Sequence, residues 1–236
     1  MAEWHHDRLE GFNLKKLASR LSVGVTAKLQ FDFACNRGHS FGEYHVHGVV
    51  NEVLSANIDP DRFRVHSGYP HPAIQTEEAK GRKRELDFLI EDKGDSSIML
   101  CIEAKWAGSG HCTAHNLLLD LCRLHLVKRT APDALCLFVL AGRQDKMNKL
   151  FESPILADGT GCLVRPGAKV NGRKRDRKKT FALIGHPTHQ TELDRFKDVN
   201  SEKLPTIPDE ICTTYAPVFD RVGRSDYWQA LVWTVF

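Results

Sequence analysis

Two neighbouring stretches of the chain alternate apolar and polar residues with the period of two that is typical of β-strands. They span residues 85–91 and 98–106, and the turn-forming residues 92–95, which include a glycine, lie between them. In the second stretch the alternation places Glu103 and Lys105 on the same face. The pattern therefore predicts a β-hairpin that carries a carboxylate and an amine side by side near its end.

Asp87 interrupts the first apolar strand, and pairing of the hairpin would bring it close to Glu103 and Lys105. Two carboxylates and a lysine are costly to desolvate without a partner, and a divalent cation would remove that cost. Carboxylate oxygens are the ligands that Mg²⁺ prefers, and Mg²⁺ completes its shell with water and phosphate. The lysine could hold or deprotonate an attacking water, or stabilise charge that develops on phosphorus. The alternative is a surface hairpin with an ordinary Glu–Lys pair worth about 0–1 kcal/mol.

Helical and strand patterns alternate on both sides of this hairpin. An apolar stripe at helical spacing predicts a helix over residues 41–57, and a first strand is expected over 63–67. Beyond the hairpin, the pattern predicts an apolar helix over 117–127, a strand buried on both faces over 134–141 and a short helix over 144–151. This alternation predicts the α/β class, with a mixed central β-sheet flanked by helices.

The predicted helix over 41–57 carries two glutamates that could complete an acidic site. Glu52 lies just off the apolar stripe, at the edge of the buried face, and is the preferred candidate. Glu43 is the alternative, although a glutamate near a helix start is already favoured by the macrodipole. His45 and His47 are two residues apart and do not share a helix face, so we interpret them as surface residues or phosphate contacts.

The segments LDFLI and CIEAKW together carry an aspartate in one apolar strand and the pattern E-x-K in the next. This combination resembles the PD-(D/E)xK nuclease superfamily, which has the restriction-endonuclease-like fold. The matching residues are Asp87, Glu103 and Lys105, and Leu86 stands where the proline of the family name would be. The resemblance covers about residues 43–150.

The resemblance implies a restriction-endonuclease-like core of helix, three-strand meander, helix, strand and helix. It also implies phosphodiester hydrolysis that depends on Mg²⁺ or Mn²⁺. By the same resemblance, Asp87, Glu103, the Ala104 carbonyl and Glu52 would hold the metal. Lys105 would orient or activate the attacking water.

Three segments are expected along the chain. Residues 1–40 form an N-terminal extension, with a helix over 9–21 and a short strand within 23–33. Residues 41–151 form the nuclease core, and residues 152–236 form a less regular elaboration that packs on the core as one domain. The aromatic and apolar C-terminus, YWQALVWTVF, is expected to be a final core element.

Basic residues are concentrated in two places, directly before Asp87 and in a loop over residues 165–179. Positive charge beside a phosphoester-cleaving site would neutralise phosphates, each adding about 0.9 to the magnitude of the log–log salt slope on duplex DNA. The predicted nucleic-acid contacts are Lys80, Arg82, Lys83, Arg84, Lys169, Arg173, Lys174, Arg175, Arg177, Lys178 and Lys179.

Length, composition and charge limit the class of protein further. A chain of 236 residues with 42% hydrophobic residues can bury the core of one large domain, and the net charge of +3 makes the position of charges more informative than their sum. We expect no membrane association, because no apolar run approaches the ~18 residues of a membrane span and the start lacks a signal-peptide pattern. The seven cysteines lie mostly in apolar segments, which indicates reduced thiols in a cytoplasmic protein.

The leading hypothesis is a Mg²⁺-dependent DNA endonuclease with a role in bacterial defence, restriction or DNA processing. DNA is favoured over RNA as the substrate, and the expected assembly is a homodimer or a larger defence or DNA-processing complex. A symmetric dimer would make a double-strand cut easiest, because one site cuts one strand. The alternative is a nuclease-like DNA-binding or assembly subunit without activity of its own. A hydrolase of small phosphates is the third candidate, and the basic loop argues against it.

Overall fold

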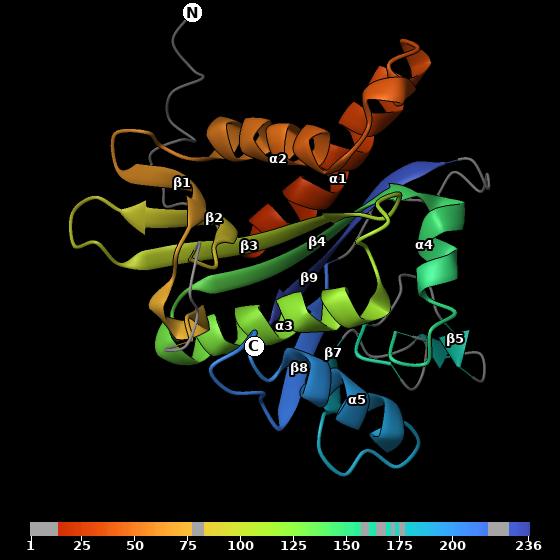
Figure 1. Ribbon diagram of the computed structural model, residues 1–236. Helices are drawn as coiled ribbons and strands as arrows, with labels where there is room; N and C mark the ends of the chain where they lie inside the picture. Colours follow the sequence, from red (N-terminus) through yellow and green to blue (C-terminus); the bar gives the residue numbers. More distant parts are fainter. Residues whose placement is uncertain are drawn as a thin grey trace, which may run out of the picture.

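The computed structural model describes residues 14–76, 83–156, 161–163, 169–170, 173–174, 178–216 and 227–236. Its centre is a seven-stranded mixed β-sheet with helices on both faces (Figure 1). The prediction of an α/β fold with a mixed central sheet is therefore confirmed. None of the helices in these ranges combines the length and the apolar character that crossing a bilayer requires.

The helices are α1 (Leu14–Ala34), α2 (Glu43–Asn57), α3 (Ala114–Thr130), α4 (Gln144–Leu150) and α5 (Gln190–Asn200). The strands of the main sheet are β1 (Phe63–Tyr69), β2 (Leu86–Asp92), β3 (Ile98–Trp106), β4 (Leu135–Arg143), β7 (Lys178–Ala182), β8 (Glu210–Tyr215) and β9 (Trp228–Val235). They lie in the order β1-β2-β3-β4-β9-β8-β7, and every neighbouring pair is antiparallel except β3 and β4. Strands β5 (Lys169–Val170) and β6 (Arg173–Lys174) form a separate antiparallel pair.

The sheet separates two apolar layers, and strand β3 shows why. Its residues alternate, so that Ile102 and Ala104 face α1 and α2, whereas Cys101 faces α3. The same alternation puts Glu103 and Lys105 on the α3 face, as the sequence pattern predicts. Figure 1 shows α1 and α2 on one side of the sheet and α3 and α5 on the other.

Helix α1 corrects the prediction of a strand within residues 23–33. Leu17, Leu21, Val25 and Leu29 recur every fourth residue, and each is at most 2% exposed. The stripe therefore continues through the β-branched residues that suggested a strand, and packing overrides their local preference. The helix lies against β9, where the Ser22 hydroxyl donates to the Ala230 carbonyl at 2.8 Å.

The C-terminal third, expected as a less regular elaboration, supplies three strands of the main sheet. Strand β9 lies between β4 and β8, and its Trp233 is fully buried. The prediction that the C-terminal segment is a core element is therefore confirmed. Its apolar side chains are buried on both faces of the sheet.

Helix α1 packs closely against helix α2 at Gly24. A Cβ at position 24 would lie 2.8 Å from Val53 Cγ2. We expect Gly24→Ala to destabilise the protein by about 1–2 kcal/mol, because overpacking outweighs the gain in helix propensity. In a Val53→Ala background the same change should stabilise it by about 0.5–1 kcal/mol. Urea unfolding measures both, and equal destabilisation in the two backgrounds would contradict the contact.

Candidate functional site

The site begins where strands β2 and β3 stop pairing. Their ladder ends at the pair Phe88 and Ile102. Beyond it, the Asp87 carboxylate accepts a hydrogen bond from the Ala104 N–H at 2.7 Å. A side chain thus replaces the backbone of β2 as the partner of β3, and polar atoms of both strands face the space between them.

Helix α3 closes this space from one face of the sheet with two charged residues. Asp120 is 2% exposed and accepts a hydrogen bond from Arg123 Nη1 at 2.9 Å. Glu103 is 1% exposed. In the described part of the chain, neither Glu103 Oε1 nor Asp120 Oδ2 has a hydrogen-bond partner, although buried polar atoms are normally satisfied.

Helix α2 approaches from the opposite face with residues four positions apart, which share one side of a helix. Glu43 Oε1 accepts a hydrogen bond from Lys105 Nζ at 3.1 Å. The His47 Nε2 atom lies 3.5 Å from both Asp87 Oδ2 and the Ala104 carbonyl oxygen. Lys105 Nζ is also 3.7 Å from Asp120 Oδ2, so this lysine links the two helices through the gap beside β3.

The pKa shifts follow from this crowding of carboxylates. Burial raises the pKa of Glu103 well above its usual value, and the charges of Asp87 and Asp120 raise it further. Burial likewise raises the pKa of Asp120, although Lys105 opposes the shift. Both carboxyl groups are therefore harder to ionise than exposed ones, because the protein's own cations do not fully offset burial and the repulsion between neighbouring carboxylates.

Asp87 and Lys105 shift the other way, each toward its charged form. Burial alone would raise the pKa of Asp87, but the imidazole of His47 and the charge of Lys105 lower it below its usual value. Burial alone would lower the pKa of Lys105, and Asp120 and the other nearby carboxylates raise it above its usual value instead. The raised pKa favours the ammonium form of Lys105. That form suits two of the roles expected for it, holding water and stabilising charge on phosphorus.

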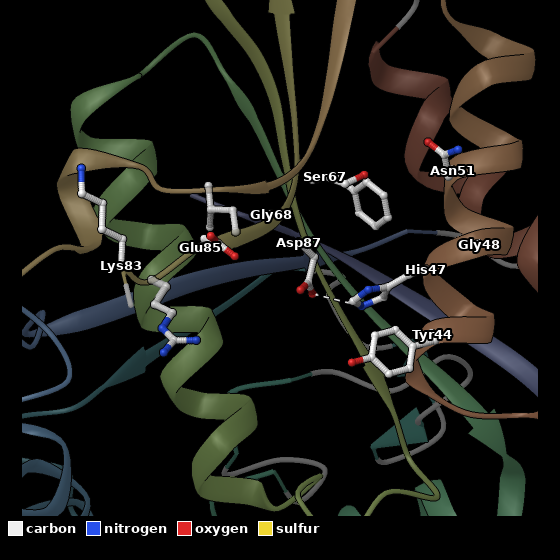
Figure 2. Close-up of a pocket in the computed structure, with 12 residues that line it drawn as sticks. Tyr44, His47, Gly48, Asn51, Ser67, Gly68, Lys83, Glu85 and Asp87 are labelled. Carbon is white, nitrogen blue, oxygen red and sulfur yellow. Dashed lines mark ion pairs between the residues drawn. The ribbon is translucent and has the colours of Figure 1, made fainter. Parts of the chain in front are cut away.

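A cavity of about 620 Å³ opens over Asp87. Figure 2 shows Asp87 and His47 pointing toward one another, with Tyr44 and Asn51 on the helix α2 side and Lys83 on the opposite side. The glycines Gly48 and Gly68 also line it. A substrate group could therefore reach the Asp87 carboxylate directly from outside.

The donor set fits a hard divalent cation only if part of the coordination shell comes from elsewhere. The described residues include no group of three or more His, Cys, Asp or Glu side chains placed to hold a metal ion. The Asp87 carboxylate, the unpartnered Glu103 Oε1 and the Ala104 carbonyl are nevertheless oxygen atoms of the kind that Mg²⁺ binds, and they lie on adjacent strands. Mg²⁺ commonly takes one or two carboxylates and fills its remaining positions with water and phosphate.

The structure brings together Asp87, Glu103 and Lys105, as expected, but not Glu52. Glu52 is exposed on α2. At about 100° per residue it lies roughly 180° around the helix from Glu43. Glu43, the alternative glutamate, is the one that reaches Lys105.

The basic residues before Asp87 have different environments. Lys83 is exposed and lines the cavity. Arg84 instead donates a hydrogen bond to the Glu202 carbonyl and so ties the start of β2 to the segment after α5. Lys80 and Arg82 lie outside the described residues.

The basic loop joins the opposite edge of the sheet. Lys178 and Lys179 begin strand β7, four strand spacings and thus about 19 Å across the sheet from β3. The backbone of Lys169, Arg173 and Lys174 forms the β5–β6 pair, and Arg175 and Arg177 lie outside the described residues.

Asp120, Arg123 and His47 are site residues that the sequence reasoning missed. Asp120 stands three residues after Leu117 and four before Leu124, both fully buried. A charged residue inside a buried helical stripe was thus the available signal, because it needs a partner there. His47 was interpreted as a surface residue or phosphate contact, and its four-residue spacing from Glu43 was the corresponding signal.

Comparison of the chain with protein-family models, with curated proteins and with solved structures gave no match.

Glu103→Gln tests the excess of buried negative charge. Because the pKa of Glu103 is raised in the folded state, its contribution to stability is full below about pH 4.5 and falls as pH rises toward its folded pKa. Without divalent cations, we expect Glu103→Gln to be more stable than the wild type at pH 7, with a smaller loss of stability between pH 5 and 7. Urea unfolding at several pH values measures both. A variant less stable than the wild type at pH 7 would contradict the prediction.

The His47–Asp87 contact predicts a second pH effect. Burial alone would lower the pKa of His47, but Asp87 raises it above 6.5. The contact therefore stabilises the protein fully below pH 6.5, and that stabilisation is lost as pH rises through the folded pKa of His47. Asp87→Asn should lower the pKa of His47 in an NMR titration, whereas Asp95→Asn, in the exposed hairpin turn, should not. An unchanged His47 titration in Asp87→Asn would refute the coupling.

Proposed function

We propose that this protein is a metal-dependent nuclease that hydrolyses phosphodiester bonds in DNA, with a site of the PD-(D/E)xK type. One observation carries the proposal. Where β2 separates from β3, the Asp87 carboxylate, the Ala104 carbonyl and a buried, unpartnered Glu103 oxygen lie beside a protonated Lys105. Desolvating charged groups at the open end of a strand pair costs free energy, and a bound cation and phosphate would offset that cost.

The order of elements also supports this assignment. From α2 to α4 the chain forms a helix, three antiparallel strands, a second helix, a strand parallel to β3 and a third helix. This is the order that the family resemblance implies for a restriction-endonuclease-like core. The resemblance concerns residues 43–150, and β7 to β9 extend the sheet beyond that region.

Asp87, Glu103 and the Ala104 carbonyl are the groups that would hold Mg²⁺ or Mn²⁺. When bound, the cation would polarise a phosphoryl oxygen and make hydroxide available near neutral pH. Asp87 suits this role because its pKa is lowered, so it is ionised without the metal. Glu103 would ionise as the cation offsets the charges of Asp87 and Asp120.

Lys105 orients the attacking water and stabilises negative charge on the phosphoryl group. Its ammonium is held between Glu43 and Asp120, close enough to Asp87 for the two charges to interact. Asp120 in turn is fixed by the hydrogen bond from Arg123. Asp120 is therefore a positioning residue, and Arg123, which lines the cavity, also offers positive charge toward phosphate.

DNA would contact the protein over more than the cavity. Lys83 lies at the cavity wall, and the basic loop leads into β7, about 19 Å across the sheet from β3. Two separated basic regions suit a long polyanion better than a small phosphate ester. A cytoplasmic setting fits the cysteines, since all seven are free thiols.

The second candidate function is that of a nuclease-like DNA-binding subunit without activity of its own. The absence of a three-ligand metal group among the described residues favours it. A binding subunit would not need Lys105 in its present position, whereas a nuclease would. Substitution of Lys105 therefore distinguishes the binding subunit from the nuclease.

Lys105→Ala is the decisive variant. We expect plasmid cleavage by the wild type with Mg²⁺ or Mn²⁺ but not with EDTA, and a decrease of about 10²–10³-fold in Lys105→Ala because charge stabilisation is lost. Lys93→Ala is the matched control, since Lys93 is exposed in the turn at the other end of the β2–β3 hairpin. Full activity of Lys105→Ala would refute its role. DNA binding without cleavage by the wild type would instead support the binding subunit.

A further inference from the structure

Helix α2 presents a second face that its apolar stripe does not use. Tyr44, His47, Gly48 and Asn51 recur at the spacing of one helix side, and all four line the cavity over Asp87. The buried stripe of the same helix, Val46, Val49, Val50 and Leu54, faces the core. The cavity face thus carries an aromatic ring, an imidazole, a bare backbone position and an amide.

Tyr44 is the most exposed large side chain on this face. It is 93% exposed, and Figure 2 shows it beside His47 on the cavity side of helix α2. An aromatic ring held on a rigid helix with both faces accessible is a stacking surface for a nucleobase. Every base has a π-face, so such stacking does not depend on the sequence.

Gly48 and Asn51 lie one and two turns beyond Tyr44 on the same side of the helix. Gly48 leaves space for a ligand, and Asn51 offers hydrogen-bonding groups. A Cβ at position 48 would meet nothing within 4 Å, so the backbone there is open to the cavity. Glycine in the interior of a helix destabilises it relative to alanine, and close approach of a ligand is one use for that position. The Asn51 amide can donate to and accept from a base edge.

The size of the cavity limits what can enter. About 620 Å³ lies within the range of small-ligand sites, roughly 300–1,000 Å³, and suits a nucleotide rather than a whole duplex. Bases inside a duplex are also covered on both faces by their neighbours. A base that stacks on Tyr44 must therefore come from a strand end, a flap or a flipped position.

We propose that the cavity between helix α2 and the start of β2 takes an unpaired nucleotide of the DNA strand, with its base stacked on Tyr44 and its phosphates directed toward Lys83. This inference rests on the proposed nuclease function and specifies its substrate as DNA with an unpaired segment. Tyr44 is the specificity residue, and Asp87 at the floor of the same cavity faces the adjoining phosphate.

The test compares a blunt duplex with the same duplex bearing a short single-stranded extension, by fluorescence anisotropy in Ca²⁺. We expect the wild type to bind the extended duplex more tightly. Tyr44→Ala should weaken that binding about 5- to 150-fold, the equivalent of one lost stacking contact, and leave the blunt duplex unchanged. Tyr44→Trp should restore it.

Gly48→Met provides an independent steric test, because its side chain would fill the cavity without disturbing the core. It should weaken binding of the extended duplex, whereas Ala56→Met, exposed on the same helix away from the cavity, should not. Equal binding of the extended duplex by Tyr44→Ala and the wild type, or an equal loss on both duplexes, would overturn the inference.

Cleavage separates failure of the inference from failure of the proposed function. If plasmid cleavage requires Lys105 but Tyr44→Ala binds the extended duplex as tightly as the wild type, the nuclease proposal stands and the unpaired-nucleotide site is refuted. If binding of the extended duplex depends on Tyr44 but the wild type cleaves no DNA with any metal, the nucleotide site is supported and the nuclease proposal is refuted.

Discussion

The excess of buried carboxylates over buried cations is the constraint on which the centre of this protein depends. Asp87, Glu103 and Asp120 are gathered around two cations, Lys105 and Arg123. Such a cluster is costly to bury, and close hydrogen-bond donors, protonation of a carboxyl group or a bound cation would each lower that cost. Helices α2 and α3 both contribute to the cluster from opposite faces of the sheet. Glu43 comes from α2 and Asp120 from α3, and both lie near Lys105.

The separation of β2 from β3 allows side chains from helix α2 and helix α3, on opposite faces of the sheet, to contact the same lysine. A continuous sheet would keep helix α2 and helix α3 apart, since sheet backbone would lie between them. At this end the Asp87 side chain takes over one backbone hydrogen bond, and Lys105 reaches Glu43 on α2 as well as Asp120 on α3. The end of the regular β2–β3 ladder therefore provides both the opening and the space in which the charged side chains meet.

The local part of this arrangement was predictable from sequence, and the long-range part was not. Period-two patterns located β2 and β3, and the side-by-side placement of Glu103 and Lys105 followed from them. The structure places Glu43, and not the preferred Glu52, beside Lys105, because the side of α2 that meets the lysine depends on how the helix packs on the sheet. Asp120 was missed for a related reason, since its partner Lys105 lies on strand β3 and only the packing of α3 on the sheet brings the two together.

Strand β9 has a consequence for how the chain folds. It is paired with β4 along eight residues, although β4 ends at Arg143 and β9 begins at Trp228. The centre of the sheet is thus closed by a contact between segments far apart in sequence, which slows folding because a long loop must be ordered first. Until that strand arrives, β4 has an open apolar edge of the kind that chaperones protect and that aggregates recruit.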